Sequence, residues 1–174
     1  MIKVYLACAL THVPKPLFKR FSRLIGSIAD ALVSDGHLVK YALKDSDPQL
    51  AFLKEKDKAK LCYKWDSDMV QWADIIIAEC SFPSTGMGIE LQIAGNENKP
   101  IILYYSSSWD SKAERKYYET PDHENHKLQI GEGYISLMAL GLPSVVEVLK
   151  YTSVSDSIEL ITKSVEQQKH NLKN

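Results

Sequence analysis

The chain has 174 residues, of which 45% are hydrophobic and 25% are charged, as is typical of one globular domain with a proper core. Its net charge of −1, without a run of basic residues, argues against nucleic acid or a membrane as a partner. Cys8, Cys62 and Cys80 form no CxxC pair, which indicates reduced thiols and no zinc site. We therefore expect one domain over residues 1–174, with no metal or cofactor. We also expect a cytoplasmic location, because the apolar first residues lack a basic leader and a cleavage site.

The first part of the chain alternates strand and helix patterns. Residues 2–7 are apolar and β-branched, residues 17–32 place apolar side chains at helical spacing, and residues 37–43 repeat the strand pattern. Asp35-Gly36 predicts the end of the helix, with Gly36 in the left-handed conformation. Residues 44–60 are polar and contain a proline, which predicts a loop with one or two short helical turns.

The next predicted helix, residues 61–72, separates two neighbouring carboxylates. At helical spacing Asp66 shares a face with Met69 and Val70, whereas Asp68 lies near the opposite face. We therefore expect Asp66 to point toward the core and Asp68 toward solvent.

The remainder of the chain continues the alternation. Residues 74–80 are almost continuously apolar, as in a central strand of a parallel sheet covered on both faces. Residues 106–132 are long and polar, which predicts either a mobile lid or a poorly ordered excursion. The other expected elements are helices over residues 89–96, 134–140 and 156–168 and strands over residues 100–105 and 145–151. This order predicts an α/β fold, a Rossmann-like three-layer sandwich with about five parallel strands.

Ligands of open α/β sheets bind beyond the carboxyl ends of the strands, here the loops at residues 8–16 and 81–88. Gly86 and Gly88 resemble the start of a dinucleotide fingerprint, but Leu91 stands in place of the third glycine. Ser84 lacks the first glycine of a nucleophile elbow. A Rossmann cofactor and a serine hydrolase are therefore both disfavoured.

Two carboxylates remain as candidates for bond-breaking chemistry. Glu90 is predicted in the first turn of a helix, where the helix dipole would keep it ionised, as a nucleophile requires. Asp66, on an inward helix face, would be more desolvated and could hold a proton or position a hydroxyl. Such a pair can cleave a glycosidic bond with retention. The structural alternative is that Glu90 only complements the helix dipole and that backbone amides satisfy Asp66.

Several segments share a pattern with one enzyme family. They are residues 4–7 (VYLA), 63–66 (YKWD), 73–79 (ADIIIAE), 83–91 (PSTGMGIEL) and 136–141 (SLMALG). They resemble the nucleoside 2-deoxyribosyltransferase superfamily, most closely its 2′-deoxynucleoside 5′-monophosphate N-glycosidase branch. The spacing from Asp66 to Glu90 matches that family without a gap.

The resemblance implies a Rossmann-like homodimer that acts on a nucleoside or nucleotide. Glu90 would attack the anomeric carbon, and Asp66 would assist as acid or base or by holding the sugar or the leaving base. Ser84 would bind the 5′-phosphate, and Ser136 would complete the site of the neighbouring subunit. The residues expected to contact the substrate are Tyr5, Ala7, Cys8, Thr11, His12, Ser84, Gly86, Gly88, Ser136 and Met138.

The loop after the first strand departs from the family pattern. The usual Gly-Ser-x-Arg-Gly-Gly is replaced by CALTHV at residues 8–13, without arginine, and Leu140 stands where the branch has a basic residue. Thr11, His12 or Lys15 could supply the missing contacts. We expect hydrolysis of the N-glycosidic bond of a (deoxy)nucleoside 5′-monophosphate. The alternatives are base exchange by a deoxyribosyltransferase and a non-catalytic nucleotide sensor.

Overall fold

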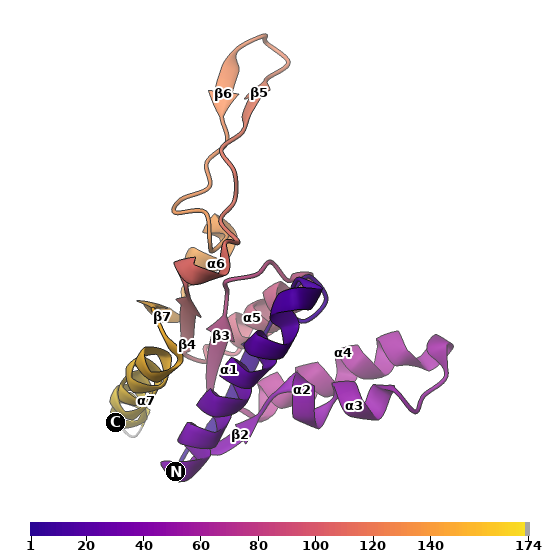
Figure 1. Ribbon diagram of the computed structural model, residues 1–174, viewed down its shortest axis with the longest axis vertical. Helices are drawn as coiled ribbons and strands as arrows, with labels where there is room; N and C mark the ends of the chain where they lie inside the picture. The colour runs from indigo at the N-terminus through magenta and orange to yellow at the C-terminus, as the bar shows by residue number, and fades with distance from the viewer. Residues whose placement is uncertain (173–174) are drawn as a thin grey trace.

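A five-stranded sheet forms the centre of the computed structural model, which describes residues 1–172 (Figure 1). Its strands are β1 (Lys3–Cys8), β2 (Leu38–Lys40), β3 (Ile75–Glu79), β4 (Ile101–Tyr105) and β7 (Val145–Lys150). They are ordered β2-β1-β3-β4-β7, and every neighbouring pair is parallel. The expected α/β fold with about five parallel strands is confirmed.

Helices cover both faces of this sheet. The long helices α1 (Lys15–Ser34) and α7 (Val154–Asn171) contact each other on one face, whereas α4 (Glu55–Trp72) and α5 (Thr85–Asn96) contact each other on the opposite face. The short helices are α2 (Ala42–Asp45), α3 (Asp47–Leu50), α6 (Leu137–Leu140) and the single 3₁₀ turn η1 (Ser107–Trp109). The arrangement is the expected three-layer sandwich. Within residues 1–172, no helix combines the length and apolarity needed to cross a membrane.

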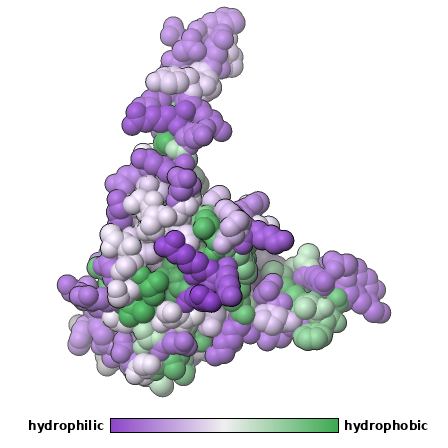
Figure 2. Space-filling model, in the orientation of Figure 1, coloured by the Kyte–Doolittle hydropathy of each residue, from purple (hydrophilic) through white to green (hydrophobic). Residues whose placement is uncertain are grey.

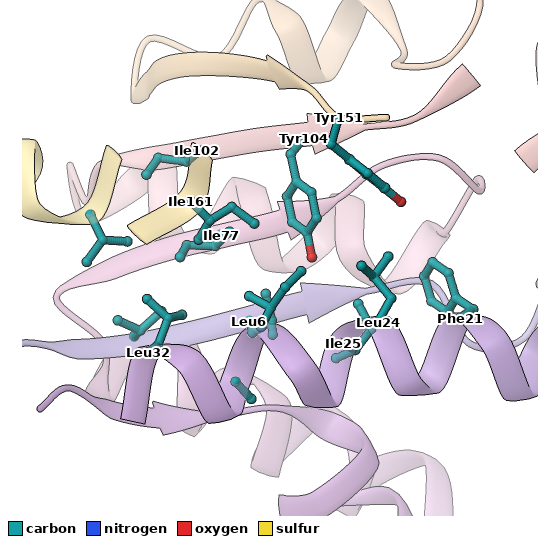
Figure 3. Packing of buried hydrophobic residues seen from close by; sticks show 14 of the residues in the cluster. Leu6, Phe21, Leu24, Ile25, Leu32, Ile77, Ile102, Tyr104, Tyr151 and Ile161 are labelled. Carbon is teal, nitrogen blue, oxygen red and sulfur yellow. The ribbon is translucent and has the colours of Figure 1, made fainter. Parts of the chain in front are cut away.

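The residues of β3 are buried on both faces, as the continuous apolar pattern predicts. Ile75 and Ile77 contribute to the core under α1 and α7, and Ile76 and Ala78 to the core under α4 and α5. Figure 3 shows the first of these cores, in which α1 packs its apolar face onto the sheet. Burying each large aliphatic side chain contributes about 1.5–3 kcal/mol, so the two cores fix the sheet between the helix layers.

Helix α1 ends at the predicted glycine. Gly36 has a φ of 82°, the amide of His37 donates to the carbonyl of Leu32 at 3.0 Å, and that of Gly36 donates to Val33 at 2.9 Å. These two bonds make a Schellman motif, in which a glycine avoids the strain that a Cβ atom would cause.

The segment after β2 is more helical than expected. The strand ends at Lys40 rather than at residue 43, because the amide of Tyr41 donates to the Asp45 carboxylate at 2.9 Å and the chain turns into α2. Helix α3 follows, and α4 begins at Glu55, six residues before the predicted start. Residues 44–60 therefore hold the end of α2, all of α3 and the first six residues of α4.

Residues 106–132, for which the sequence predicts a mobile lid or a poorly ordered excursion, form the turn η1 and a β-hairpin. Strands β5 (Tyr117–Glu119) and β6 (Asn125–Lys127) pair antiparallel, and all their residues are exposed. The hairpin projects from the body of the molecule (Figure 1) and is mostly hydrophilic (Figure 2). We name residues 112–132 the arm.

Candidate active site

Helix α5 begins earlier than the sequence predicts. The hydroxyl oxygen of Ser84 accepts a hydrogen bond from the amide of Met87 at 3.2 Å, so Ser84 is the N-cap. Gly86 and Gly88, predicted in the preceding turn, belong to the helix itself. Glu90 consequently lies in the second turn and not in the first.

Glu90 is held by a tyrosine from the neighbouring strand β1. The Tyr5 hydroxyl donates to Oε1 of Glu90 at 2.8 Å, and Tyr5 is only 1% exposed. Burial raises the pKa of Glu90 to about 7; the Tyr5 hydrogen bond opposes this rise, and the charge of Asp66 adds to it. The prediction that the helix dipole keeps Glu90 fully ionised is wrong, because the dipole acts mainly within the first turn and desolvation dominates here. Near neutral pH, Glu90 exists in both protonation states.

Asp66 lies on the inward side of α4, as predicted. Its Oδ1 accepts from the Ser46 hydroxyl at 2.7 Å, and its Oδ2 accepts from the Cys62 thiol at 3.4 Å. Asp68 is exposed and pairs with Lys64 at 2.5 Å, so helical phase distinguished the two carboxylates correctly. Among the described residues, the partners of Asp66 are these side chains and not the backbone amides of the structural alternative.

Asp66 and Glu90 line the same pocket, which has a volume of about 220 Å³. Apart from the two carboxylates its wall is largely apolar, and the complete set of lining residues is Ala59, Cys62, Tyr63, Asp66, Ser67, Gly86, Ile89, Glu90 and Ile93. An apolar cavity with a few convergent polar groups is typical of a site for a small organic ligand. We call it the Glu90 pocket.

A second pocket, of about 320 Å³, lies at the start of α5. Ser84, Gly88 and Ser136 line it together with Tyr134, and we call it the Ser84 pocket. Ser136 is the N-cap of α6, with its hydroxyl oxygen 3.3 Å from the amide nitrogen of Ala139. One chain thus brings two N-capping serines to a common cavity, whose lining on α5 extends to Leu91, the residue after Glu90.

The remaining predicted contact residues have varied positions. Ala7 is fully buried in β1, and Cys8 is half-buried at its end, where burial raises the pKa of the thiol. That shift disfavours the thiolate, in agreement with a packing role. Thr11 and His12 lie in an exposed turn, and Met138 is 84% exposed. None of these last three lines the Glu90 pocket or the Ser84 pocket, so the structure does not bring them to either cavity.

Sequence reasoning missed both residues that contact Asp66. Cys62 precedes Asp66 by one helical turn, so helical spacing could have indicated it. Ser46 lies 20 residues before Asp66, in a segment predicted as a polar loop, and no local signal indicates the contact. Only the packing of α3 against α4 creates it.

A separate buried carboxylate, Glu79, ends strand β3. It accepts hydrogen bonds from the amide and hydroxyl of Ser81 and from the Tyr151 hydroxyl at 2.9 Å. Tyr151 in turn accepts from the indole N–H of Trp109 at 2.5 Å. Burial raises the pKa of Glu79 to about 7 against the lowering effect of these donors.

Similar architecture occurs in solved structures. The CMP N-glycosidase BcmB of Clostridium botulinum matches with a TM-score of 0.55 and 17% identity, covering 92% of this chain and 98% of that one. This chain has the same fold as that protein. A conserved protein from Enterococcus faecalis V583 matches with a TM-score of 0.56 and 17% identity over 94% of this chain and 99% of that one.

A 2-deoxyribosyltransferase from Bacillus psychrosaccharolyticus matches over a smaller part, 59% of this chain and 72% of that one, with 24% identity and a TM-score of 0.46. No protein-family model matches the sequence, and no curated protein is similar enough to it to be matched. The resemblance expected from the sequence is confirmed at the level of the fold by the match to the CMP N-glycosidase.

Proposed function

We propose that this chain hydrolyses the N-glycosidic bond of a nucleoside or a (deoxy)nucleoside 5′-monophosphate and releases the base. The observation that carries the proposal is the position of Glu90, which is bonded to Tyr5 inside a pocket shared with Asp66. The same fold in a CMP N-glycosidase supports this choice of substrate class. A largely apolar wall suits a nucleobase, and two carboxylates suit chemistry at the sugar.

In the proposed reaction, the ionised carboxylate of Glu90 attacks the anomeric carbon. A bond forms between a carboxylate oxygen and that carbon, the bond from the carbon to the base nitrogen breaks, and its electron pair leaves with the base. Asp66 holds the sugar or the base, or provides a proton to the leaving nitrogen. Water then hydrolyses the glycosyl ester and restores Glu90, so two displacements retain the anomeric configuration.

The Ser84 pocket is proposed to hold the 5′-phosphate. Two serine hydroxyls, from Ser84 and Ser136, can donate to phosphate oxygens, and the start of α5 adds amide groups and a favourable dipole. We further propose a homodimer, with Ser136 serving the Ser84 pocket of its own chain rather than the neighbour's site, because both serines line one cavity of a single chain. Helix α6 supports this, because Leu137 and Met138 are 48% and 84% exposed and offer an apolar surface for a second copy.

A nucleotide sensor without catalysis is the second candidate. The loop after β1 favours a sensor. The family resemblance implies that this loop contacts the phosphate, but its residues Thr11 and His12 lie outside both pockets. Base exchange is a variant of the first candidate, with a second nucleobase in place of water.

The test is a panel of ribo- and deoxyribonucleosides and their 5′-monophosphates, incubated with and without a second free base, with chromatography of the products. We expect base release that depends on Glu90, with Glu90→Ala inactive and Asp68→Ala, an exposed carboxylate variant on α4, active. A new nucleoside formed with the added base would establish exchange. Release from no substrate would refute the glycosidase proposal, and nucleotide binding without release would establish the sensor.

A further inference from the structure

The two carboxylate oxygens of Asp66 are held in different ways. Oδ1 accepts a hydrogen bond of 2.7 Å from the Ser46 hydroxyl, which is a strong donor. Ser46 is only 1% exposed. Oδ2 faces Cys62, whose thiol is a weak donor at 3.4 Å. Cys62 lines the Glu90 pocket, and Ser46 lies behind Asp66, outside that lining. One oxygen is therefore fixed from the protein interior and the other is held loosely on the ligand side.

Ser46 is itself fixed on both sides by backbone hydrogen bonds. Its amide donates to the carbonyl of Ala42 at 3.2 Å, and its own carbonyl accepts from the amides of Gln49 and Leu50 at 3.1 and 3.2 Å. It is the junction at which α2 ends and α3 begins. Its hydroxyl therefore has a defined position relative to Asp66.

The use of this hydroxyl differs from that of the other serines that begin helices. Ser84, Ser106, Ser136 and Ser153 each accept a hydrogen bond from an amide of their own helix. Ser46 occupies the N-cap position of α3 but makes no side-chain cap, and its hydroxyl donates to Asp66 instead. A serine N-cap stabilises its helix, so α3 forgoes a stabilising contact that the hydroxyl could have made.

We propose that Ser46 is a positioning residue that fixes Oδ1 of Asp66, and that the Cys62 thiol occupies the place at Oδ2 where a donor of the substrate binds. This rests on the proposed function, since the donor is a sugar hydroxyl or a base N–H group. Replacement of the Cys62 thiol by the substrate donor at Oδ2 is favourable, because an O–H or N–H donor makes a stronger hydrogen bond to a carboxylate than an S–H group does. The hydroxyl at Ser46 keeps the carboxylate plane aligned while that exchange occurs.

The kinetic test compares variants at both donors with the substrate that wild type turns over. Ser46→Ala should lower kcat about tenfold or more with a small change in KM, and Ser46→Thr, which keeps the hydroxyl, should recover activity. Cys62→Ser should raise KM several-fold, because a stronger internal donor competes for Oδ2, whereas Cys62→Ala should leave KM unchanged or lower it. Ser153→Ala, a cap far from the pocket, is the matched control and should lower Tm without changing kcat. A Ser46→Ala variant with wild-type kcat, or equal KM for the two Cys62 variants, would overturn the assignment.

A second measurement does not depend on turnover. Burial, with the charge and hydrogen bond of Asp66, raises the pKa of the Cys62 thiol to about 11, so iodoacetamide should label it slowly. Ser46→Ala should release Asp66 and speed labelling of the Cys62 peptide several-fold, approaching the rate of Asp66→Asn, as followed by mass spectrometry. Labelling at the wild-type rate would overturn the role of Ser46 even if bases are released. Faster labelling in a protein that releases no base would refute the proposed function and leave the hold of Ser46 on Asp66 established.

Discussion

Glu79 and Glu90 share a residue type and a raised pKa, but only one of them faces a cavity. Burial raises the pKa of each carboxyl to about 7. Glu79 is completely buried and accepts hydrogen bonds from Ser81 and Tyr151, so its oxygens are occupied by the protein. Glu90 has one donor among residues 1–172, Tyr5, and lines a pocket with Asp66. A raised pKa therefore indicates only that a carboxyl group is buried. The candidate for chemistry is the buried carboxyl group that also faces a pocket.

The two glutamates also lie on opposite sides of the sheet. Glu79 packs with Tyr151 and Trp109 in the aromatic region of the core under α1 and α7 (Figure 3 shows Tyr151 and Tyr104 there). Glu90 reaches Tyr5 from α5 on the other face. We infer that one face of the sheet stabilises the fold at this end and the other presents the carboxyl group that is proposed to react.

The largest expected effect is on catalysis at Glu90. Glu90→Gln should lower kcat for base release by on the order of 10³-fold or more, because an amide cannot form the glycosyl ester. Its Tm should stay within a few degrees of wild type. Glu79→Gln, measured under the same conditions per folded molecule, should keep kcat within a few-fold. Comparable losses of kcat in both variants would remove the contrast between the two sites.

A smaller effect concerns the pH dependence of stability. The pKa of Glu79 is about 7 in the folded state against an ordinary value of 4.5, so the folded protein binds this proton more tightly than the unfolded chain. Its contribution to the free energy of unfolding is therefore full below pH 4.5, falls as the pH rises to about 7, and is constant above. Glu79→Gln cannot titrate, so the difference between wild type and this variant should decline by about 3 kcal/mol over that interval. Urea unfolding at several pH values measures it, and a constant difference would contradict the burial argument.

The smallest expected effect concerns the hydrogen bond that the Tyr5 hydroxyl donates to Glu90. The Tyr5 hydroxyl lowers the pKa of Glu90, so Tyr5→Phe should move the acidic limb of the profile of kcat/KM against pH to higher pH. Wild type should gain activity as the pH rises through about 7, since the nucleophile must be ionised. Activity that instead falls through this range would assign Glu90 as a general acid. Tyr63→Phe, an exposed tyrosine at the same pocket, is the matched control.

Local patterns predicted some of this site and could not predict the rest. Helical phase distinguished Asp66 from Asp68, because the direction of a side chain on a helix depends on nearby residues alone. The start of α5 was placed four residues too late, since Gly86 and Gly88 are more typical of a turn than of a helix. That error put Glu90 in the wrong turn, where the expected effect of the helix dipole hid the rise of its pKa by burial. The contact between Ser46 and Asp66 depends on how α3 packs against α4, which no local sequence pattern encodes.

The arm lies in the connection between two strands that are direct neighbours in the sheet. Strands β4 and β7 pair directly in the sheet, and the base of the arm is closed by the Ala113 amide, 2.7 Å from the carbonyl oxygen of Gly133. Its tip, residues 121–124, is fully exposed. Since the entropy of closing a loop grows slowly with its length, additional sequence at this tip has little effect on folding. The tip is therefore the natural place to insert an affinity tag or a fluorescent reporter while both pockets stay intact.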